Sequence, residues 1–482
     1  MMQRPILVLA SDAALSGLIA RSLRLQGIYA KPLPMTVSAG ETLSFSPCGI
    51  IWATPQKSGG DVPIPDEVVQ KAGIPMLVLG EAATALCLSF GGKIAGQSEG
   101  AQSVTLGLSA HPLFGGIAGG GRKLHGLDYL SLSQSMEPLV TATEQCIGFV
   151  HKELPLYAME YPIEHNDPDV GRLLYNFSIQ ICGALTDWNE AAVIQQAVQQ
   201  IRNAAGNAEV LCAVSGGLDS AVCAKLAHMA VGDRLRCVFI DNGLLRKGEG
   251  ESIPVIFETG MGLTVHTIDA GSRFLSALAQ VEGFEEKQRI TATLLEQVLR
   301  NEMSSHPGLQ SVIIGTNLND LLQPHTAEEA EPSLALRVIE PLRDLFKEEV
   351  RRIGFSLALP DSILHRQSFP SGGLALRIAG RICPKKLALS RTVNAFFDEE
   401  ICTSGHEKRL WQYYAFLMDS QTACGTYMVM LRAMHTAQNG PYAARLPYDL
   451  LERVTQRIRS EAPEVGCVAY DLTPDVLDDE QE

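Results

Sequence analysis

Short apolar runs alternate with amphipathic segments along most of the chain. Runs rich in Ile, Leu and Val occur at 5–10, 49–54, 74–80 and 103–108. With helix-compatible segments between them, such runs are typical of largely buried strands in an α/β domain. The first run breaks at Ser11 and Asp12 and continues with helical spacing, which predicts a strand and then a helix, not a signal peptide.

A second α/β unit is predicted after an amphipathic segment at 187–205. That segment reads as a helix joining two domains, with Asp187 as its N-cap. Apolar runs then recur at 209–214, 236–241, 264–269 and 311–316. Because helical patterns separate them, these runs predict strands in parallel order.

The pattern changes after about Pro360, where a third, α+β region is expected. Strands are expected at 369–380, 427–436 and 466–473, around helices such as 447–461. The chain is therefore expected to form three domains, at 1–186, 187–360 and 361–482.

Composition and charge narrow the class of function. The chain has 482 residues, is 46% hydrophobic and carries a formal net charge of −15, so general nucleic-acid binding is excluded and a small-molecule substrate is favoured. The longest apolar segment, 74–92, contains Glu81 and does not predict a membrane span. The 11 cysteines form no C-x-x-C pair, which indicates reduced thiols in a cytoplasmic protein.

One loop carries the strongest chemical signal in the sequence. The string SGGLDS, at 215–220, lies between an apolar run ending at Val214 and a helical run from Ala221. A strand, a glycine-containing loop and a helix N-terminus together present backbone N–H groups to an anion such as phosphate. The alternative is a helix-capping turn without a ligand, which a bare Gly-Gly pair would favour and the complete string does not.

The string resembles the pyrophosphate-binding loop of ATP pyrophosphatases, and other segments narrow the resemblance to GMP synthases. These segments are CVFIDNGLLRKGE (237–249), IDAGSRFLSAL (268–278), VIEPLRDLFKEEVRRIG (338–354), SGGLALRI (371–378) and ARLPYDLLERVTQRI (444–458). The resemblance implies a class I glutamine amidotransferase-like domain, a parallel-sheet ATP pyrophosphatase domain and a C-terminal α+β domain that forms a homodimer. In such enzymes ATP adenylates the C2 oxygen of XMP, and ammonia then displaces AMP.

The resemblance also implies roles for individual residues. The ATP phosphates would be held by Ser215, Gly216, Gly217, Leu218, Asp219 and Ser220. Asp219 would also hold Mg²⁺, the backbone around Ile240 would meet the adenine, and Lys347 would stabilise the departing pyrophosphate. Lys347 taken alone is better explained as a solvated lysine on a helix, but its setting in PLRDLFKEEVRR favours the pyrophosphate role. Asp241 ends a strand where open α/β sheets place ligand contacts, and the alternative is that it caps a turn.

The same resemblance predicts that the N-terminal domain has lost its chemistry. Gly80 stands where the nucleophilic cysteine is expected, Pro162 where the histidine is expected, and Glu164 keeps the place of the acid. Ala53 and Thr54 replace the Gly-Gly oxyanion turn, and Cys87 lies about two helical turns beyond the nucleophile position. We expect a glutaminase fold that does not hydrolyse glutamine.

The acceptor half is altered as well. A histidine-rich loop of the family is reduced to one histidine, His325, and the tail has no Lys or Arg after Arg459. Arg366 and Arg377 match family arginines near the acceptor, and Arg445 could reach it, although each is equally compatible with a surface ion pair.

The sequence therefore predicts an enzyme that uses ATP to adenylate XMP or a related acceptor for amination by free ammonia. The alternative is a non-catalytic, nucleotide-binding or regulatory relative of GMP synthase. The intact loop and Lys347 favour the enzyme, whereas the acidic tail favours the alternative.

Overall fold

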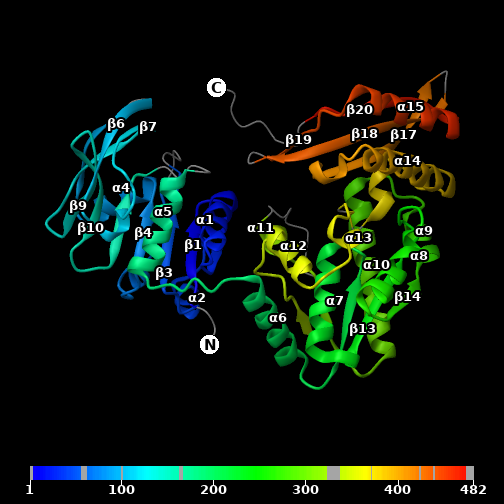
Figure 1. The fold of residues 1–482 in the computed structure, drawn as a ribbon, viewed down its shortest axis with the longest axis horizontal. Coiled ribbons are helices and arrows are strands. Elements are labelled where there is room, and N and C mark those ends of the chain that lie inside the picture. The colour runs from blue at the N-terminus through cyan, green and yellow to red at the C-terminus, as the bar shows by residue number, and fades with distance from the viewer. Residues whose placement is uncertain are drawn as a thin grey trace. The chain divides into compact units, whose positions relative to one another are not determined.

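The computed structural model of the chain describes residues 4–55, 62–98, 101–161, 167–322, 337–367, 369–370, 372–422, 425–437 and 440–473. The chain divides into two compact units, the first running to Val193 and the second containing most of the remaining residues (Figure 1). Within the described ranges, no helix combines the length and the apolar character that crossing a bilayer requires.

The first unit is built on a mixed sheet, in the order β2-β1-β3-β4-β11-β10-β9-β6-β7. The parallel part comprises β1 (Ile6–Ala10), β2 (Ala30–Pro34), β3 (Gly49–Ala53), β4 (Met76–Leu79) and β11 (Leu156–Met159). The antiparallel part comprises β6 (Ala101–Leu108), β7 (Gly121–His125), β9 (Met136–Ala142) and β10 (Gln145–His151). A separate antiparallel pair is formed by β5 (Lys93–Gln97) and β8 (Asp128–Ser131). The four apolar runs are thus confirmed as strands.

The helices of this unit follow the strands closely. They are α1 (Ala13–Leu25), α2 (Ala39–Ser44), α3 (Glu67–Gln70), α4 (Glu81–Ser89) and α5 (Pro168–Asn176). Asp12 caps α1, since its Oδ1 accepts a hydrogen bond of 2.8 Å from the Leu15 amide. The polar break after the first apolar run is therefore a helix start.

Helix α6 (Glu190–Ala205) begins later than predicted. Asn189, not Asp187, accepts a hydrogen bond from the amide of Ala192, at 3.0 Å. A cap must lie just before the first helical residue to reach an amide in the first turn, and Asp187 is too early for that.

The second unit contains a parallel sheet in the order β14-β13-β12-β15-β16. Its strands are β12 (Glu209–Val214), β13 (Leu235–Asp241), β14 (Val265–Asp269), β15 (Leu309–Ile313) and β16 (Arg337–Ile339). Its helices are α7 (Leu218–Val231), α8 (Glu249–Val255), α9 (Gly271–Leu278), α10 (Phe284–Ser305), α12 (Lys347–Ser356) and α13 (Asp361–Leu364). Helix α11 (Leu318–Leu322) begins at the last residue of this stretch of the unit, and Asn319–Pro324 belong to the first unit. The predicted parallel order is confirmed, and the strand order reverses between β12 and β15.

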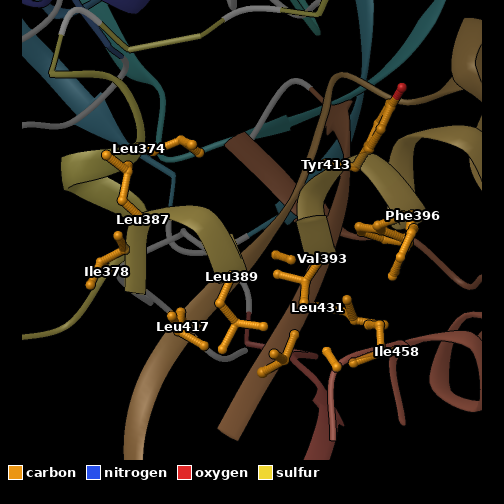
Figure 2. Packing of buried hydrophobic residues seen from close by; sticks show 14 of the residues in the cluster. Leu374, Ile378, Leu387, Leu389, Val393, Phe396, Tyr413, Leu417, Leu431 and Ile458 are labelled. Carbon is orange, nitrogen blue, oxygen red and sulfur yellow. The ribbon is translucent and has the colours of Figure 1, made fainter. Parts of the chain in front are cut away.

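A second sheet packs on two helices in the C-terminal part of this unit. Its strands are β17 (Gln412–Thr422), β18 (Gly425–Ala437), β19 (Gly440–Ala443) and β20 (Val465–Tyr470), and its helices are α14 (Pro384–Thr403) and α15 (Tyr448–Glu461). Figure 2 shows the buried cluster between them, to which Val393, Leu431 and Ile458 contribute from α14, β18 and α15. The strands predicted at 427–436 and 466–473 and the helix at 447–461 are thus confirmed.

The strand predicted at 369–380 is wrong. The structure places a 3-10 helix at Gly373–Arg377, and only Ile378 makes an isolated bridge, to Leu417. Gly373 has a φ of +57°, and its amide donates to Pro370, which turns the chain out of an extended path. The apolar residues of the segment enter the buried cluster from a turn instead of a sheet (Figure 2).

A buried lysine joins the two halves of the second unit. Lys287 of α10 is 1% exposed, and its Nζ donates to the carbonyls of Ile378 and Gly380, at 2.7 and 2.6 Å. Burial, and then the nearby Lys386, lower the pKa of Lys287 to about 8 from 10.5.

Replacing Lys287 by Met should lower the free energy of unfolding by about 2 kcal/mol or more, because two carbonyls lose their donor. Between pH 8 and 10.5 the unfolded chain binds more protons at this lysine than the folded chain does. Lys287 therefore makes the free energy of unfolding rise with pH in that window, and the variant should lack this contribution. Denaturant unfolding across the window tests both points, with Lys385→Met, at an exposed lysine, as the control. Equal stability of the two variants would contradict the assignment.

Candidate functional site

The loop at 215–220 lies where the strand order of the parallel sheet reverses. It joins the carboxyl end of β12 to helix α7, and the loop after the neighbouring β15 lies beside it. In open α/β sheets, ligands bind in the crevice that opens at such a reversal. The first-turn N–H groups of α7 have no acceptor within the helix, so they are available to an anion.

Hydrogen bonds within the loop hold it in one conformation. The Ser220 hydroxyl donates to the Gly217 carbonyl, at 3.0 Å, and accepts from the Ser215 amide, at 3.2 Å. The Ser215 hydroxyl accepts from the Gly217 amide, at 3.3 Å. Both serine side chains therefore shape the loop.

The two glycines of the loop have different roles. Gly216 has a φ of +76°, and a Cβ added there would overlap the guanidinium of Arg366 and lie 2.8 Å from Ile253. Gly217 has a φ of −76°, and a Cβ there would meet only the Ser215 hydroxyl, at 3.4 Å. The backbone therefore requires glycine at Gly216, whereas Gly217 has a φ that other residues also adopt.

The loop after β15 contacts Asp219. The Asn317 side-chain amide donates to Oδ2 of Asp219, at 3.3 Å. A Cβ on Gly315 would lie 3.2 Å from the Asp219 Cβ, so the backbone of that loop approaches the first turn of α7 closely. Asp219 therefore lies against the loop that follows β15.

Lys347 is half-buried and is the first residue of α12. The segment before Lys347 contacts the loop after β15. The amide of Leu318, the residue that follows Asn317, donates to the Leu345 carbonyl, at 2.8 Å. This arrangement places the start of α12 beside the strand ends that flank the loop.

Ile240 and Asp241 end β13, the strand that pairs with β12 on its other side. Oδ1 of Asp241 accepts from the Gly243 amide, at 2.9 Å, so the turn-capping alternative for Asp241 is realised. Ile240 is half-buried and leaves its strand at the same edge of the sheet as the loop.

Arg366 is the one expected acceptor arginine that the described contacts bring to the loop. Its guanidinium lies against Gly216 and forms an ion pair with Glu249, the first residue of α8. The ion-pair alternative for Arg366 is thus realised, at the candidate site itself.

Arg377 and Arg445 lie in different surroundings. The Arg377 guanidinium stacks 3.4 Å from the centre of the Tyr414 ring, and burial lowers its pKa. Arg445 is exposed in the loop between β19 and α15. His325, like the end of the acidic tail from residue 474, lies outside the described residues.

Comparisons with known proteins show which family the chain belongs to. The family described as GMP synthase C terminal domain matches residues 399–476. GMP synthase [glutamine-hydrolyzing] of Caldicellulosiruptor saccharolyticus is 32% identical, and that of Bacillus cytotoxicus is 34% identical, each alignment covering 97% of both chains. This chain belongs to the GMP synthase family. The structure of NMN synthetase from Francisella tularensis covers 39% of this chain and 78% of its own, with 18% identity and a TM-score of 0.33.

Gly80, the expected nucleophile position of a GMP synthase glutaminase, lies on a sharp turn between β4 and α4. Its φ is +82° and its ψ is −153°. A strand, a strained turn and a helix are the setting in which hydrolases of this type expose a nucleophile. The backbone of the turn is therefore present without the side chain.

The loop after β3 fills the space in front of this turn. A Cβ on Gly80 would overlap the carbonyl oxygen of Thr54 and lie 3.0 Å from that of Pro55. The amide of Glu81, which would serve an oxyanion hole, donates to Pro55 at 3.1 Å, and the amide of Ala82 donates to the Thr54 hydroxyl at 2.9 Å. Oxygens of the loop after β3 thus accept hydrogen bonds from the two amides that follow Gly80.

The thiol nearest in sequence offers no substitute. Cys87 is fully buried in α4, and burial raises its pKa to about 11. The two described positions after β11 hold Glu160 and Tyr161, both buried, and neither is an imidazole. Pro162 and Glu164, to which the sequence assigned the lost base and the acid, lie outside the described residues.

Three residues around the candidate site were not identified from the sequence: Gly315, Asn317 and Glu249. The first two follow β15, so the rule that ligands bind where strand order reverses could have found them once the order was known. Glu249 ends the string LLRKGE, but nothing local to that string indicates that it pairs with an arginine far along the chain.

Proposed function

We propose that this chain is an ATP-dependent ligase that adenylates XMP or a related acceptor and aminates it with free ammonia. The observation that carries the proposal is the loop at 215–220, at the reversal of the parallel sheet and at the N-terminus of α7. Membership of the GMP synthase family supports ATP as the substrate that this loop holds.

In the proposed reaction an acceptor oxygen attacks the α-phosphorus of ATP, and the bond from that phosphorus to pyrophosphate breaks. Ammonia then attacks the activated carbon, and AMP leaves with the oxygen. The loop amides, Ser215 and Ser220 would hold the phosphates. Lys347 would stabilise the negative charge that develops on the pyrophosphate as it departs.

The residues at the loop fit a magnesium ion. Mg²⁺ is usually bound in such sites by one or two carboxylates together with substrate phosphates and water, and Asp219 supplies a carboxylate beside the helix N-terminus. In the described part of the chain, no three His, Cys, Asp or Glu side chains form a metal-binding group of their own. The ion would neutralise phosphate charge, and Asn317 would orient the Asp219 carboxylate.

Free ammonia is proposed as the nitrogen source because of the turn at Gly80. A glycine offers no nucleophile, and oxygens of Thr54 and Pro55 accept from the amides that follow it. Together with Pro162 at the expected position of the base, these changes concern three separate parts of one mechanism, so restoring one of them should not restore hydrolysis.

Formation of AMP and pyrophosphate from ATP tests the proposal directly. The complete chain, with Mg²⁺, ammonium and millimolar XMP, should release both products in equal amounts, and omission of the acceptor should abolish release. Nucleotide binding with no turnover under any acceptor would instead support the non-catalytic alternative, which the acidic tail favours.

We expect this chain to bind XMP more weakly than a GMP synthase whose C-terminal tail carries basic residues. The chain carries six acidic residues from Asp471 to Glu482 and no Lys or Arg there, while Asp471 already pairs with Arg432, at 2.9 Å. One lost charge-assisted contact costs roughly 1.5–3 kcal/mol, or about one to two decades in affinity. Calorimetry of XMP in the presence of ATP measures this, with xanthosine as the phosphate-free control. Low-micromolar XMP affinity would show that other cations replace the tail.

A further inference from the structure

Arg366 lies against the loop at 215–220, although the two are far apart in the sequence. It follows α13, and its guanidinium occupies the space where a side chain on Gly216 would lie. The side chain of Arg366 is 15% exposed, so most of it is enclosed at the loop.

The contacts of Arg366 leave donors unused. Its Nη2 donates to Oε1 of Glu249, and among the described residues Nη1 has no acceptor, although it lies beside Gly216. Nη1 is accessible to solvent, since it is not one of the unpaired polar side-chain atoms that are buried in the described residues. A guanidinium nitrogen that has N–H groups without an acceptor and lies beside the loop at 215–220 can donate charge-assisted hydrogen bonds to an anion bound there.

Glu249 is held in place from several directions. Its side chain is 11% exposed, and Oε2 accepts from the Arg246 amide, at 2.9 Å. Arg246 in turn donates to the Gln367 carbonyl, at 3.1 Å, and lies 4.4 Å from the centre of the Phe369 ring. These contacts hold the Glu249 carboxylate, at the start of α8, beside the segment that carries Arg366. The carboxylate in turn holds the Arg366 guanidinium in place.

We propose that Arg366 contacts the pyrophosphate portion of ATP, not the acceptor, and that Glu249 is the residue that positions it. This inference rests on the proposed function. As the bond between the α-phosphorus and the bridging oxygen breaks, its electron pair passes to the leaving pyrophosphate. A guanidinium already placed against the loop meets that charge with little reorganisation. Without Glu249, the long side chain of Arg366 would lose the one hydrogen-bond acceptor that it has among the described residues.

The test compares Arg366→Lys, Arg366→Ala and Glu249→Gln in the complete chain. The matched controls are Arg381→Ala and Glu282→Gln, an ion pair of the same kind whose side chains are 61% and 64% exposed. KM for ATP, KM for XMP and kcat are measured with saturating ammonium and Mg²⁺. Arg366→Ala should raise KM for ATP by about ten- to hundredfold, Glu249→Gln by about tenfold, and both should leave KM for XMP within about twofold.

A double variant separates positioning from a general structural role. If Glu249 acts through Arg366, Glu249→Gln should add little to the ATP defect in the Arg366→Ala background, whereas independent effects would multiply. Melting temperatures identify variants that fail to fold, and Arg366→Lys, which keeps charge and stem, remains informative if Arg366→Ala does not fold.

Three results would overturn the inference: a rise in KM for XMP and not for ATP, no change in either, or fully multiplicative defects in the double variant. Calorimetry of ATP with the unaltered protein distinguishes a failure of the proposed function. No ATP binding there would remove the proposed function itself. Normal binding there and equal binding in Arg366→Ala would remove only the role of Arg366.

Discussion

Replacing Asp219 by Ala is expected to lower the rate of pyrophosphate release by about 10²-fold or more. The carboxylate lies in the first turn of α7, beside the loop amides and the Asn317 amide, where it would share the metal ion with the phosphates. Lys347→Ala should cost a similar factor, because adenylyl transfer depends chiefly on fixed positive charge around the leaving group.

Two controls match these changes. Asp233→Ala removes an exposed carboxylate just beyond the C-terminal end of α7, about 20 Å from Asp219 along the helix at ~1.5 Å per residue. Lys408→Ala removes an exposed lysine of the C-terminal part. Both should keep normal rates of pyrophosphate release. Unchanged turnover in Asp219→Ala and Lys347→Ala would reject the assignment of the loop as the ATP site.

Gly80→Cys is expected to give no glutaminase activity and to destabilise the first unit. The new Cβ would overlap the Thr54 carbonyl oxygen and lie 2.8 Å from its carbon, so backbone has to move. Overpacking of this kind costs about 1–3 kcal/mol, in addition to the strain of a side chain at a φ of +82°. Among the described residues, Glu160 and Tyr161, which follow β11, offer the new thiol no imidazole. The amides of Glu81 and Ala82 already donate to Pro55 and Thr54.

Gly73→Cys is the matched control for this variant. Gly73 has a similar φ, +72°, but no atom lies within 4 Å of the added Cβ. Urea unfolding should therefore show a larger loss for Gly80→Cys than for Gly73→Cys, and the difference reports the overlap alone. Glutamate released from glutamine above background by either the unaltered protein or Gly80→Cys would refute the lost-glutaminase proposal.

The α/β class and the parallel sheet of the second unit could be predicted because their signals are local. Each strand is a short apolar run, and the loop after Val214 carries its own glycines, serines and aspartate within six residues. The family resemblance then ordered these pieces, and the comparisons confirm it.

The remainder depends on contacts between residues far apart in sequence. Glu249 and Arg366 are separated by 117 positions, and no periodicity connects them. The segment 369–380 has the apolar composition of a strand, but the turn at Gly373 and the hydrogen bond from the Leu374 amide to the Leu244 carbonyl decide its shape. The oxygens that lie in front of the Gly80 turn likewise come from Thr54 and Pro55. Backbone oxygens give no signal in the sequence.

Isotope labelling distinguishes ammonium from glutamine as the source of the nitrogen in the product. The complete chain is incubated with ATP, Mg²⁺ and millimolar XMP, and with either ¹⁵N-ammonium or glutamine labelled in its amide. We predict pyrophosphate and AMP in step with an aminated product that carries label from ammonium only. Label arriving from glutamine, or amination without pyrophosphate release, would contradict it.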